Sequence, residues 1–302
     1  MKKICAVIVT YNRSELLCRC VEHLLAQSYP LDVLIYDNHS SQDTKSELIK
    51  RDLLKDNVTY YYAPENTGGS GGFHNGMKMA MGKGYDAIWL MDDDGYAVNE
   101  STLSEVIKSW EDLDYQDCML NSLVVCDEKE LKLSFSLDRT YDGKEIISRA
   151  KNNLVRDLIS PFNGTFVTKG VIDLLGYPIK EFFVYGDETE YFLRVKTNGF
   201  PIYSVVNSLY YHPSIVVSEK KVFGYDVSTT NMPLWKTYCS SRNTIYFSKK
   251  YLGKKVVLRN IVKFYVGVLF NKKNKAKKLK KVTEGIIDGL KGDFSKPLDL
   301  SR

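Results

Sequence analysis

The stretch Ala87-Ile88-Trp89-Leu90-Met91-Asp92-Asp93-Asp94 sets five apolar residues directly before three aspartates. A short apolar run bounded by polar residues is typical of a strand that is buried on both faces of a parallel sheet. Ligands of open α/β sheets bind beyond the carboxyl ends of such strands. We therefore predict a buried strand over 87–91 that carries the aspartates to the edge of a ligand site.

Upstream of this run, strand-like and helical patterns alternate. Apolar residues recur at helical spacing after Ser14, which we expect to cap the first helix. Such alternation is the signature of βαβ units and a parallel sheet. The predicted strands cover 3–10, 31–36 and 58–63, and the predicted helices cover 14–25, 41–54 and 73–81.

Polar residues follow each of the four predicted strands, which are these three and the strand at 87–91. They lie at 10–13, 37–40, 66–72 and 92–94. Because the carboxyl ends of parallel strands share one edge of the sheet, the topology brings the four clusters together. This convergence is the first indication of a functional site.

The rest of the chain shows shorter patterns. Residues 118–212 mix short strands with helices, and the chain beyond residue 233 is predicted to be helical. The individual elements are strands over 119–126, 131–136 and 164–168, a helix over 187–194, a strand pair within 201–212, and helices over 235–250, 254–270 and 280–289.

Three adjacent carboxylates need neutralising. Like charges this close together are costly unless a cation binds between them. Mg²⁺ and Mn²⁺ take oxygen ligands, typically one or two carboxylates together with substrate phosphates and water. The alternative is a solvated acidic turn, and the position directly after a buried strand favours the metal site.

Residues 66–73 supply four glycines in five positions, at 68, 69, 71 and 72, before a helical pattern. Glycine lets backbone N–H groups approach a phosphate or a sugar closely, and the start of the following helix favours negative charge. A flexible linker is the alternative. We predict a glycine-rich ligand-binding loop.

Five segments together resemble the family 2 inverting glycosyltransferases, which have a GT-A fold. They are residues 9–13, 36–43, 65–69, 90–94 and 186–191, and the resemblance spans roughly residues 3–212. It implies an α/β fold with a Rossmann-like, mostly parallel sheet and flanking helices, followed by a helical C-terminal region. The expected domains are 1–215, with a nucleotide-sugar half at 1–100 and an acceptor half at 101–215, and a basic helical region at 216–302.

The resemblance also implies roles for individual residues at the donor site. Two aspartates of the triplet, Asp92 and Asp94, match the metal and diphosphate motif, and Asp93 between them is expected to face the sugar. His212 matches a third metal ligand, although a lone histidine is more often structural. The implied cofactor is Mn²⁺ or Mg²⁺. The implied donor-binding residues are Thr10, Asn12 and Arg13 for the nucleotide, Asp37 and Asn38 for uracil and ribose, and Asn66, Gly68 and Gly69 in the glycine-rich segment.

The predicted helix at 187–194 has three carboxylates in its first turn. Acidic residues favour helix N-termini in any case. Glycosyl transfer, however, needs a carboxylate within hydrogen-bond reach to take the proton of the acceptor hydroxyl. By resemblance, Glu188 is the expected base, with Asp187 as the alternative.

Within the family, the wording of residues 66–73 together with the aspartate triplet most resembles galactofuranosyltransferases, with rhamnosyltransferases as near relatives. The expected donor is therefore UDP-galactofuranose, and dTDP-rhamnose is the alternative. The expected acceptor is a glycan or lipid-linked glycan in bacterial cell-surface polysaccharide or glycolipid synthesis. A protein of another class, which binds a nucleotide sugar without turnover, is the remaining alternative.

Positive charge is concentrated near the C-terminus. Residues 249–281 hold thirteen Lys or Arg and no Asp or Glu, so the net charge of +5 leaves the remaining chain at about −8. Residues 254–281 combine basic and apolar positions at helical spacing, which is compatible with a core helix bearing a solvated lysine tail or with an anionic membrane surface. A nucleic-acid partner is not expected.

The compartment is predicted from absent signals. The sequence has no secretory leader pattern and no uninterrupted apolar run of about 18 residues, the length that a spanning helix needs. Its six cysteines lack the spacing of a disulfide scaffold. We expect a cytoplasmic protein, either soluble or peripheral at the cytoplasmic face of the membrane.

Overall fold

The computed structural model describes residues 1–214, 219–222, 225–228, 232–270 and 274–300. The chain forms two compact units, the first made of residues 1–180 and 194–215 and the second of 181–193 and 216–302. Residues 181–193, which the sequence-based division places in the 1–215 domain, thus group with the C-terminal residues. The domain boundaries predicted from the sequence remain a prediction.

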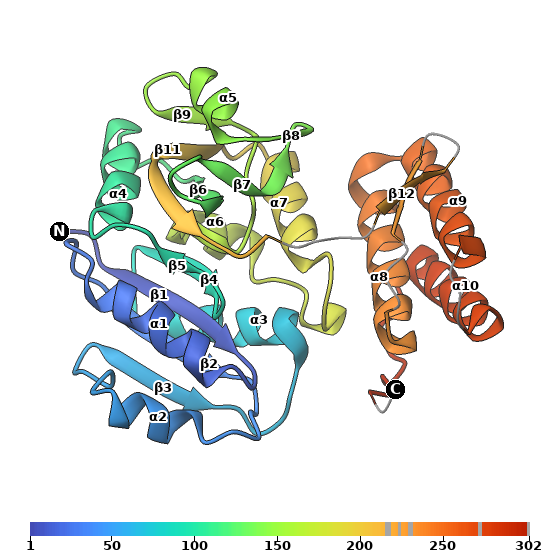
Figure 1. Cartoon of the computed structure of the whole chain (residues 1–302), viewed down its shortest axis with the longest axis horizontal. Helices are drawn as coiled ribbons and strands as arrows, with labels where there is room; N and C mark the ends of the chain where they lie inside the picture. The colour runs from blue at the N-terminus through green and yellow to red at the C-terminus, as the bar shows by residue number, and fades with distance from the viewer. Residues whose placement is uncertain (215–218, 223–224, 229–231, 271–273, 301–302) are drawn as a thin grey trace. The chain divides into compact units, whose positions relative to one another are not determined.

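The first half of the sheet is parallel (Figure 1). Its strands are β1 (Ile4–Thr10), β2 (Asp32–Asp37), β3 (Val58–Tyr62) and β4 (Ala87–Asp92), in the order β3-β2-β1-β4. Helices α1 (Ser14–Leu25), α2 (Thr44–Lys50) and α3 (Gly68–Met81) connect them. β1 is buried along its whole length, and β4 is buried up to its last residue. The predicted βαβ pattern and the buried strand before the aspartates are confirmed.

The second half of the sheet is mixed. Strand β10 (Asn163–Thr168) runs antiparallel to β4 and continues the sheet to β6 (Met119–Asp127), β11 (Ile202–Tyr211) and β5 (Tyr96–Ala97). β7 (Lys132–Leu137) and β8 (Thr140–Asp142) extend from β6, and β9 (Leu154–Arg156) pairs with β11. The remaining helices before residue 200 are α4 (Thr102–Asp112), α5 (Gly143–Ser148), α6 (Lys169–Leu175), the 3₁₀ turn η1 (Lys180–Phe182) and α7 (Asp187–Thr197), of which residues 181–193 belong to the second unit.

The prediction of a strand pair within 201–212 is wrong. The structure has one strand, β11, whose pairing with β6 shifts register between Val205 and Leu209. Ser208 in this step is buried, and its hydroxyl donates to the Thr102 carbonyl. The polar residues in the middle of the run therefore form a bulge rather than a turn.

The glycine-rich segment is helical, so the predicted loop over 66–72 ends at Thr67. A Cβ on Gly72 would lie 2.5 Å from Val9 Cγ1, and one on Gly76 would lie 2.7 Å from Val7 Cγ1. These glycines let α3 pack directly on β1. Because close helix–sheet contact needs the same residue type as a ligand loop, the sequence alone did not distinguish the two.

Two helix starts also differ from the prediction. The N-cap of α1 is Arg13 rather than Ser14. α2 begins at Thr44, later than predicted, because the side chain of Asp43 accepts a hydrogen bond from the Ser46 N–H and caps the helix there.

The second unit contains a helical bundle. α8 (Leu234–Phe247) continues into a π-helical turn, η2 (Ser248–Leu252), and is followed by α9 (Lys254–Phe270) and α10 (Lys275–Lys291). β12 (Glu219–Val222) and β13 (Tyr225–Ser228) form an antiparallel hairpin. The bundle core includes Ile245, Val257 and Ile286. In the described part of the chain, no helix combines the length and apolarity needed to cross a membrane.

Candidate functional site

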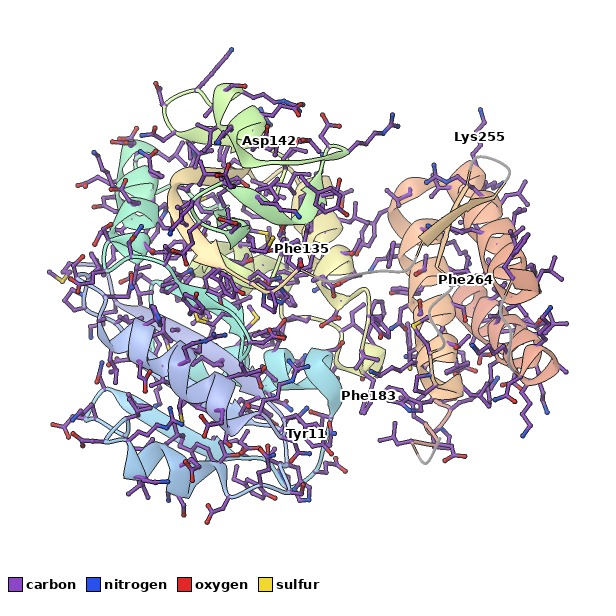
Figure 2. All side chains as sticks on the ribbon, in the orientation of Figure 1. Tyr11, Phe135, Asp142, Phe183, Lys255 and Phe264 are labelled. Carbon is purple, nitrogen blue, oxygen red and sulfur yellow. The ribbon has the colours of Figure 1, made fainter. Side chains whose placement is uncertain are left out.

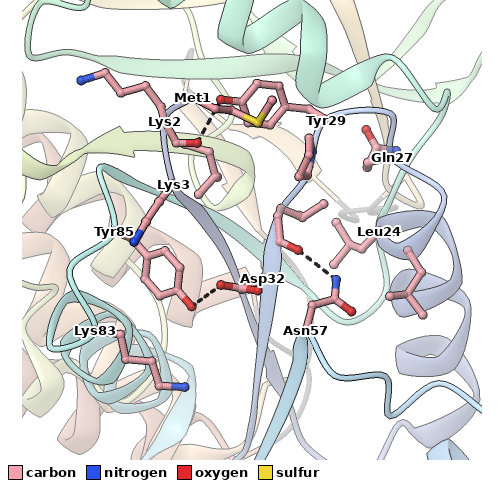
Figure 3. A pocket seen from close by; sticks show the side chains of 14 residues that line it. Met1, Lys2, Lys3, Leu24, Gln27, Tyr29, Asp32, Asn57, Lys83 and Tyr85 are labelled. Carbon is pink, nitrogen blue, oxygen red and sulfur yellow. Dashed lines mark hydrogen bonds between the residues drawn. The ribbon is translucent and has the colours of Figure 1, made fainter.

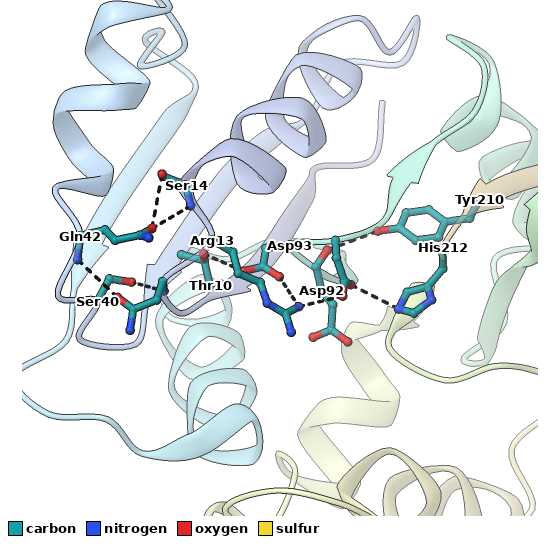
Figure 4. Close-up of polar contacts among 11 residues, drawn as sticks. Thr10, Arg13, Ser14, Ser40, Gln42, Asp92, Asp93, Tyr210 and His212 are labelled. Atoms are coloured by element: carbon teal, nitrogen blue, oxygen red, sulfur yellow. Dashed lines mark hydrogen bonds and ion pairs between the residues drawn. The ribbon is translucent and has the colours of Figure 1, made fainter. Parts of the chain in front are cut away.

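Asp92, Asp94 and His212 form one cluster at the carboxyl ends of β4 and β11. Each offers a ligand atom, and these atoms lie within 4.8 Å of one another. β5 explains their meeting, because it begins two residues after Asp94 and pairs with the end of β11 at Tyr211. Figure 4 labels Asp92 and His212 at the two strand ends.

The protonation of His212 follows from its contacts. Nδ1 lies 2.7 Å from the Pro213 carbonyl oxygen, which only accepts, so Nδ1 carries a proton. Nε2 then faces Asp94 Oδ1 at 3.2 Å. Burial would lower the pKa of His212, but the Asp94 carboxylate and the Pro213 carbonyl raise it above its ordinary value. In the neutral tautomer, Nε2 has a lone pair available for a metal ion.

Two residues that contact His212 were not predicted from the sequence. The Ser134 hydroxyl donates to the His212 carbonyl oxygen at 2.6 Å, and the Phe135 ring lies 4.9 Å from the imidazole. Both come from β7, and Figure 2 labels Phe135. Ser134 holds the backbone of His212 and Phe135 packs on its ring, through contacts that only the tertiary fold creates.

The cluster fits a divalent cation. Asp94 Oδ1 is buried and makes no aligned hydrogen bond with the described residues, although His212 lies close to it. Burial would raise the pKa of Asp94, but His212 and Arg13 hold it below its usual range. A buried, ionised oxygen without an aligned donor is a ready ligand, and two carboxylates with one imidazole suit Mn²⁺ or Mg²⁺.

Asp93 is not a member of this cluster, although Arg13 bonds to both Asp93 and Asp94. It is 3% exposed, and it accepts hydrogen bonds from the Thr10 hydroxyl at 2.8 Å and from Arg13 at 3.2 Å (Figure 4). Burial raises its pKa to about 6, against the opposing effects of Thr10 and Arg13. A direct contact between Asp93 and a sugar remains a prediction.

Arg13 joins the triplet to the first loop. Its guanidinium lies 2.7 Å from Asp94 Oδ2, and half of its side chain is exposed. Asn12, with φ of 56°, braces the same loop, because its Oδ1 accepts from the N–H of Ser41 at 2.8 Å and its N–H donates to Ser40 Oγ at 2.8 Å. The loops after β1 and β2 are thereby held together.

Asp37, the last residue of β2, and Asn38, which follows it, are both buried. Asp37 is fully buried, and its oxygens accept from the Ser40 N–H at 2.8 Å and the Tyr60 hydroxyl at 2.6 Å. The amide nitrogen of Asn38 donates to the Gly68 carbonyl at 2.9 Å and to Asn66 Oδ1 at 3.1 Å. These side chains therefore shape the donor-side loops, and a contribution of Tyr60 was not foreseen.

Two predicted glycines open the start of α3. Gly68 has φ of 71°, in the left-handed region that favours glycine. A Cβ on Gly69 would meet nothing within 4 Å, so open space borders this turn. The structure thus gathers the predicted donor-side residues into one connected edge of the first unit.

The acidic start of α7 lies in the second unit. Asp187 is 6% exposed and Glu188 is more exposed. Glu190 is fully buried, and its carboxylate accepts from the Tyr251 hydroxyl at 2.6 Å. Glu190 therefore has a structural partner, and the choice of base between Glu188 and Asp187 remains a prediction.

A separate cavity of about 610 Å³ lies at the opposite edge of the sheet (Figure 3). Lys3, Leu24 and Asp32 line it near the amino ends of β1 and β2, and the Tyr85 hydroxyl donates to Asp32 at 2.7 Å. It contains none of the predicted site residues. The cavity is open, and the chemistry indicated by the sequence lies at the other strand ends.

Residues 5–168 match the sequence model of glycosyl transferase family 2, which is more than half of the chain. The galactofuranosyltransferase GlfT1 of Mycolicibacterium smegmatis is 30% identical over 229 residues, covering 73% of this chain and 74% of that protein. The GalNAc(5)-diNAcBac-PP-undecaprenol beta-1,3-glucosyltransferase of Campylobacter jejuni is 27% identical over 170 residues, covering 55% and 50%. The chain belongs to glycosyl transferase family 2.

Solved structures agree on the fold. TarS 1–349 of S. aureus, in complex with UDP-GlcNAc, superposes with a TM-score of 0.55 at 15% identity, covering 95% of this chain and 72% of that one. The mannosyltransferase PcManGT of Pyrobaculum calidifontis, in complex with GDP-Man and Mn²⁺, gives 0.55 at 11% identity, covering 97% and 87%. The chain has the α/β, GT-A fold predicted from its sequence.

Proposed function

We propose that this chain transfers galactofuranose from UDP-galactofuranose to an acceptor hydroxyl, with inversion at the anomeric carbon. The donor assignment is supported by the 30% identity to a galactofuranosyltransferase along three quarters of both chains. The cluster of Asp92, Asp94 and His212 at the strand ends is the observation that supports placing this reaction at that site. We propose that this cluster is the cation site of the enzyme.

On the donor side, we assign Asp92, Asp94 and His212 to hold Mn²⁺ or Mg²⁺. A bound cation of this kind supplies Lewis-acid stabilisation to the departing nucleoside diphosphate. Arg13 adds a fixed positive charge beside Asp94, with half of its side chain open to solvent. The open space at Gly69, at the start of α3, accommodates the donor without a side-chain clash.

On the acceptor side, we assign Glu188 as the base, with Asp187 as the alternative. The carboxylate removes the proton of the acceptor hydroxyl as its oxygen attacks the anomeric carbon. A single displacement by the acceptor inverts the configuration there. The greater exposure of Glu188 supports its assignment, because the base has to reach the acceptor.

We further propose that the acceptor is a glycan or lipid-linked glycan at the cytoplasmic face of a membrane, which α9 contacts. Figure 2 shows Lys255 projecting from the start of α9. Apolar and basic side chains alternate on the exposed side of this helix, a composition that fits an anionic lipid surface. The exposed residues of α9 are Lys254, Lys255, Leu258, Arg259, Val262, Lys263, Leu269 and Phe270. Of the predicted 254–281 contact, residues 271–273 lie outside the described residues.

A donor panel tests the proposal. The purified chain is incubated with Mn²⁺, a glycolipid extract, and UDP-galactofuranose, UDP-galactopyranose or dTDP-rhamnose. We expect release of UDP and a new glycolipid only with the furanose donor. Turnover with dTDP-rhamnose alone would make the donor assignment wrong, and UDP binding without turnover with any donor would indicate a non-catalytic module.

A further inference from the structure

The backbone that leads into α7 is unusual. Phe183 and Tyr185 have φ of 65°, and Gly186 has φ of 84°. The Val184 N–H donates to the Phe182 carbonyl at 2.8 Å, which closes a γ-turn around Phe183. Bulky side chains seldom adopt this conformation, which persists only where surrounding contacts hold it.

One side-chain amide makes those contacts. Asn243 of α8 is fully buried, and its Nδ2 lies within hydrogen-bond distance of three carbonyl oxygens of this segment. It reaches the carbonyl oxygens of Phe182 at 3.0 Å, Val184 at 3.0 Å and Tyr185 at 2.8 Å. A single donor group therefore gathers the carbonyls of the segment on one side.

Arg242 fixes the orientation of that amide. Its Nε donates to Asn243 Oδ1 at 2.9 Å, and a guanidinium only donates, so the amide oxygen must face it. Its Nη2 donates to the carbonyls of Glu181 at 2.8 Å and Phe182 at 3.2 Å. Arg242 as a whole is 1% exposed, and its guanidinium lies over the ring of Phe294.

The segment also lies tightly against α8. A Cβ on Gly186 would be 3.0 Å from Phe247 Cε1 and 3.7 Å from Asn243 Cβ. The Gly186 carbonyl accepts from the Glu190 N–H at 2.8 Å, which begins α7. Glu190 is held in turn by Tyr251. Both sides of the first turn of α7 are thus anchored within the second unit.

We propose that Arg242 and Asn243 are positioning residues for the catalytic carboxylate. Both are buried and act through the 181–186 segment, which places Asp187 and Glu188 in the first turn of α7. The proposal rests on the proposed function. The oxygen of a base must lie within about 2.6–3.2 Å of the hydroxyl oxygen whose proton it abstracts, and a displacement of about 1 Å costs on the order of 100-fold in rate.

Asn243→Asp is the principal variant, because it keeps the size of the side chain and replaces the donor by an oxygen that repels the three carbonyls. We expect kcat to fall about 100-fold, while the donor KM and the Kd of UDP with Mn²⁺ stay within about threefold. Gly186→Ala perturbs the same segment from its other side and should give the same pattern. Ser241→Ala is the matched control, since its buried hydroxyl bonds, among the residues that the structure describes, only to carbonyls of its own helix.

A double-mutant cycle separates positioning from general destabilisation. If Asn243 acts through the base, adding Asn243→Asp to a chain that already carries Glu188→Gln should lower kcat little further. If Asp187→Asn rather than Glu188→Gln identifies the base, the cycle uses Asp187→Asn instead. The proposal would be overturned if the two substitutions reduced kcat in the double variant by the product of their separate effects. A wild-type kcat in both Asn243→Asp and Gly186→Ala would overturn it as well. A wild-type chain without transferase activity would instead overturn the proposed function.

Discussion

Nε2 of His212 and Oδ1 of Asp94 lie 3.2 Å apart, although the two residues follow different strands in opposite halves of the sheet. The histidine is oriented by the Pro213 carbonyl on its other nitrogen, so both atoms point to one place. Without a cation the two atoms lie within hydrogen-bond range of each other, and with a cation both would become ligands. This relationship makes metal binding testable without any sugar substrate.

Asp94→Asn should abolish binding of Mn²⁺, because it removes the buried ionised oxygen and leaves an amide in its place. Isothermal titration with Mn²⁺ and UDP measures the loss directly. Asp56→Asn, an exposed aspartate in the turn before β3, is the matched control and should bind as the wild type does. Equal Mn²⁺ affinity in Asp94→Asn would contradict the assignment.

Ser134→Ala should weaken the same site indirectly. Its hydroxyl holds the backbone of His212, and residues that orient a metal ligand typically contribute about 10–100-fold to metal affinity or activity. We expect a loss at the low end of this range, with the melting temperature of the metal-free protein changed by only a few degrees. An unchanged Mn²⁺ affinity would show that this contact does not orient the histidine.

Gly72→Ala should destabilise the first unit, because its Cβ would lie 2.5 Å from Val9 Cγ1. Overpacking of this kind costs about 1–3 kcal/mol in the free energy of unfolding, measured by urea denaturation. Gly69→Ala is the control, since its Cβ meets nothing within 4 Å and alanine favours a helix. Equal stability of the two variants would count against the packing role of the glycines.

The glycines also show how much of the fold could be predicted from the sequence. Strand and helix periodicity predicted β1 to β4 within one or two residues, since these patterns reflect burial. The loop at 68–72 was mispredicted because glycine serves close packing and ligand contact alike. The bulge in β11 was missed because the Ser208 hydroxyl makes its hydrogen bonds with partners on β6 and α4, which are distant in the sequence.

The candidate site was predictable in part. The aspartate triplet and His212 were found from their position after strands and from family resemblance. Ser134, Tyr60 and Asn243 were not, because their roles depend on carbonyls and side chains distant in the chain. Such contacts leave no local pattern in a single sequence.

Lys255→Gln, Arg259→Gln and Lys263→Gln combined should reduce binding to vesicles that contain phosphatidylglycerol. Each basic residue near an anionic surface contributes about 1 kcal/mol, so the triple variant should bind on the order of 100-fold more weakly. Co-sedimentation at low salt measures this, with vesicles of phosphatidylcholine alone as the control. Undiminished binding of the triple variant would rule out α9 as the contact.

The central claim is that Asp92, Asp94 and His212 hold the cation that binds the donor diphosphate. Anomalous diffraction from a crystal containing UDP and Mn²⁺ tests it most directly. We predict one strong manganese peak within coordination distance of Asp94 and His212, with the diphosphate of UDP on its open side. A manganese peak at another place on the chain, with this cluster unliganded while UDP is bound, would contradict the account.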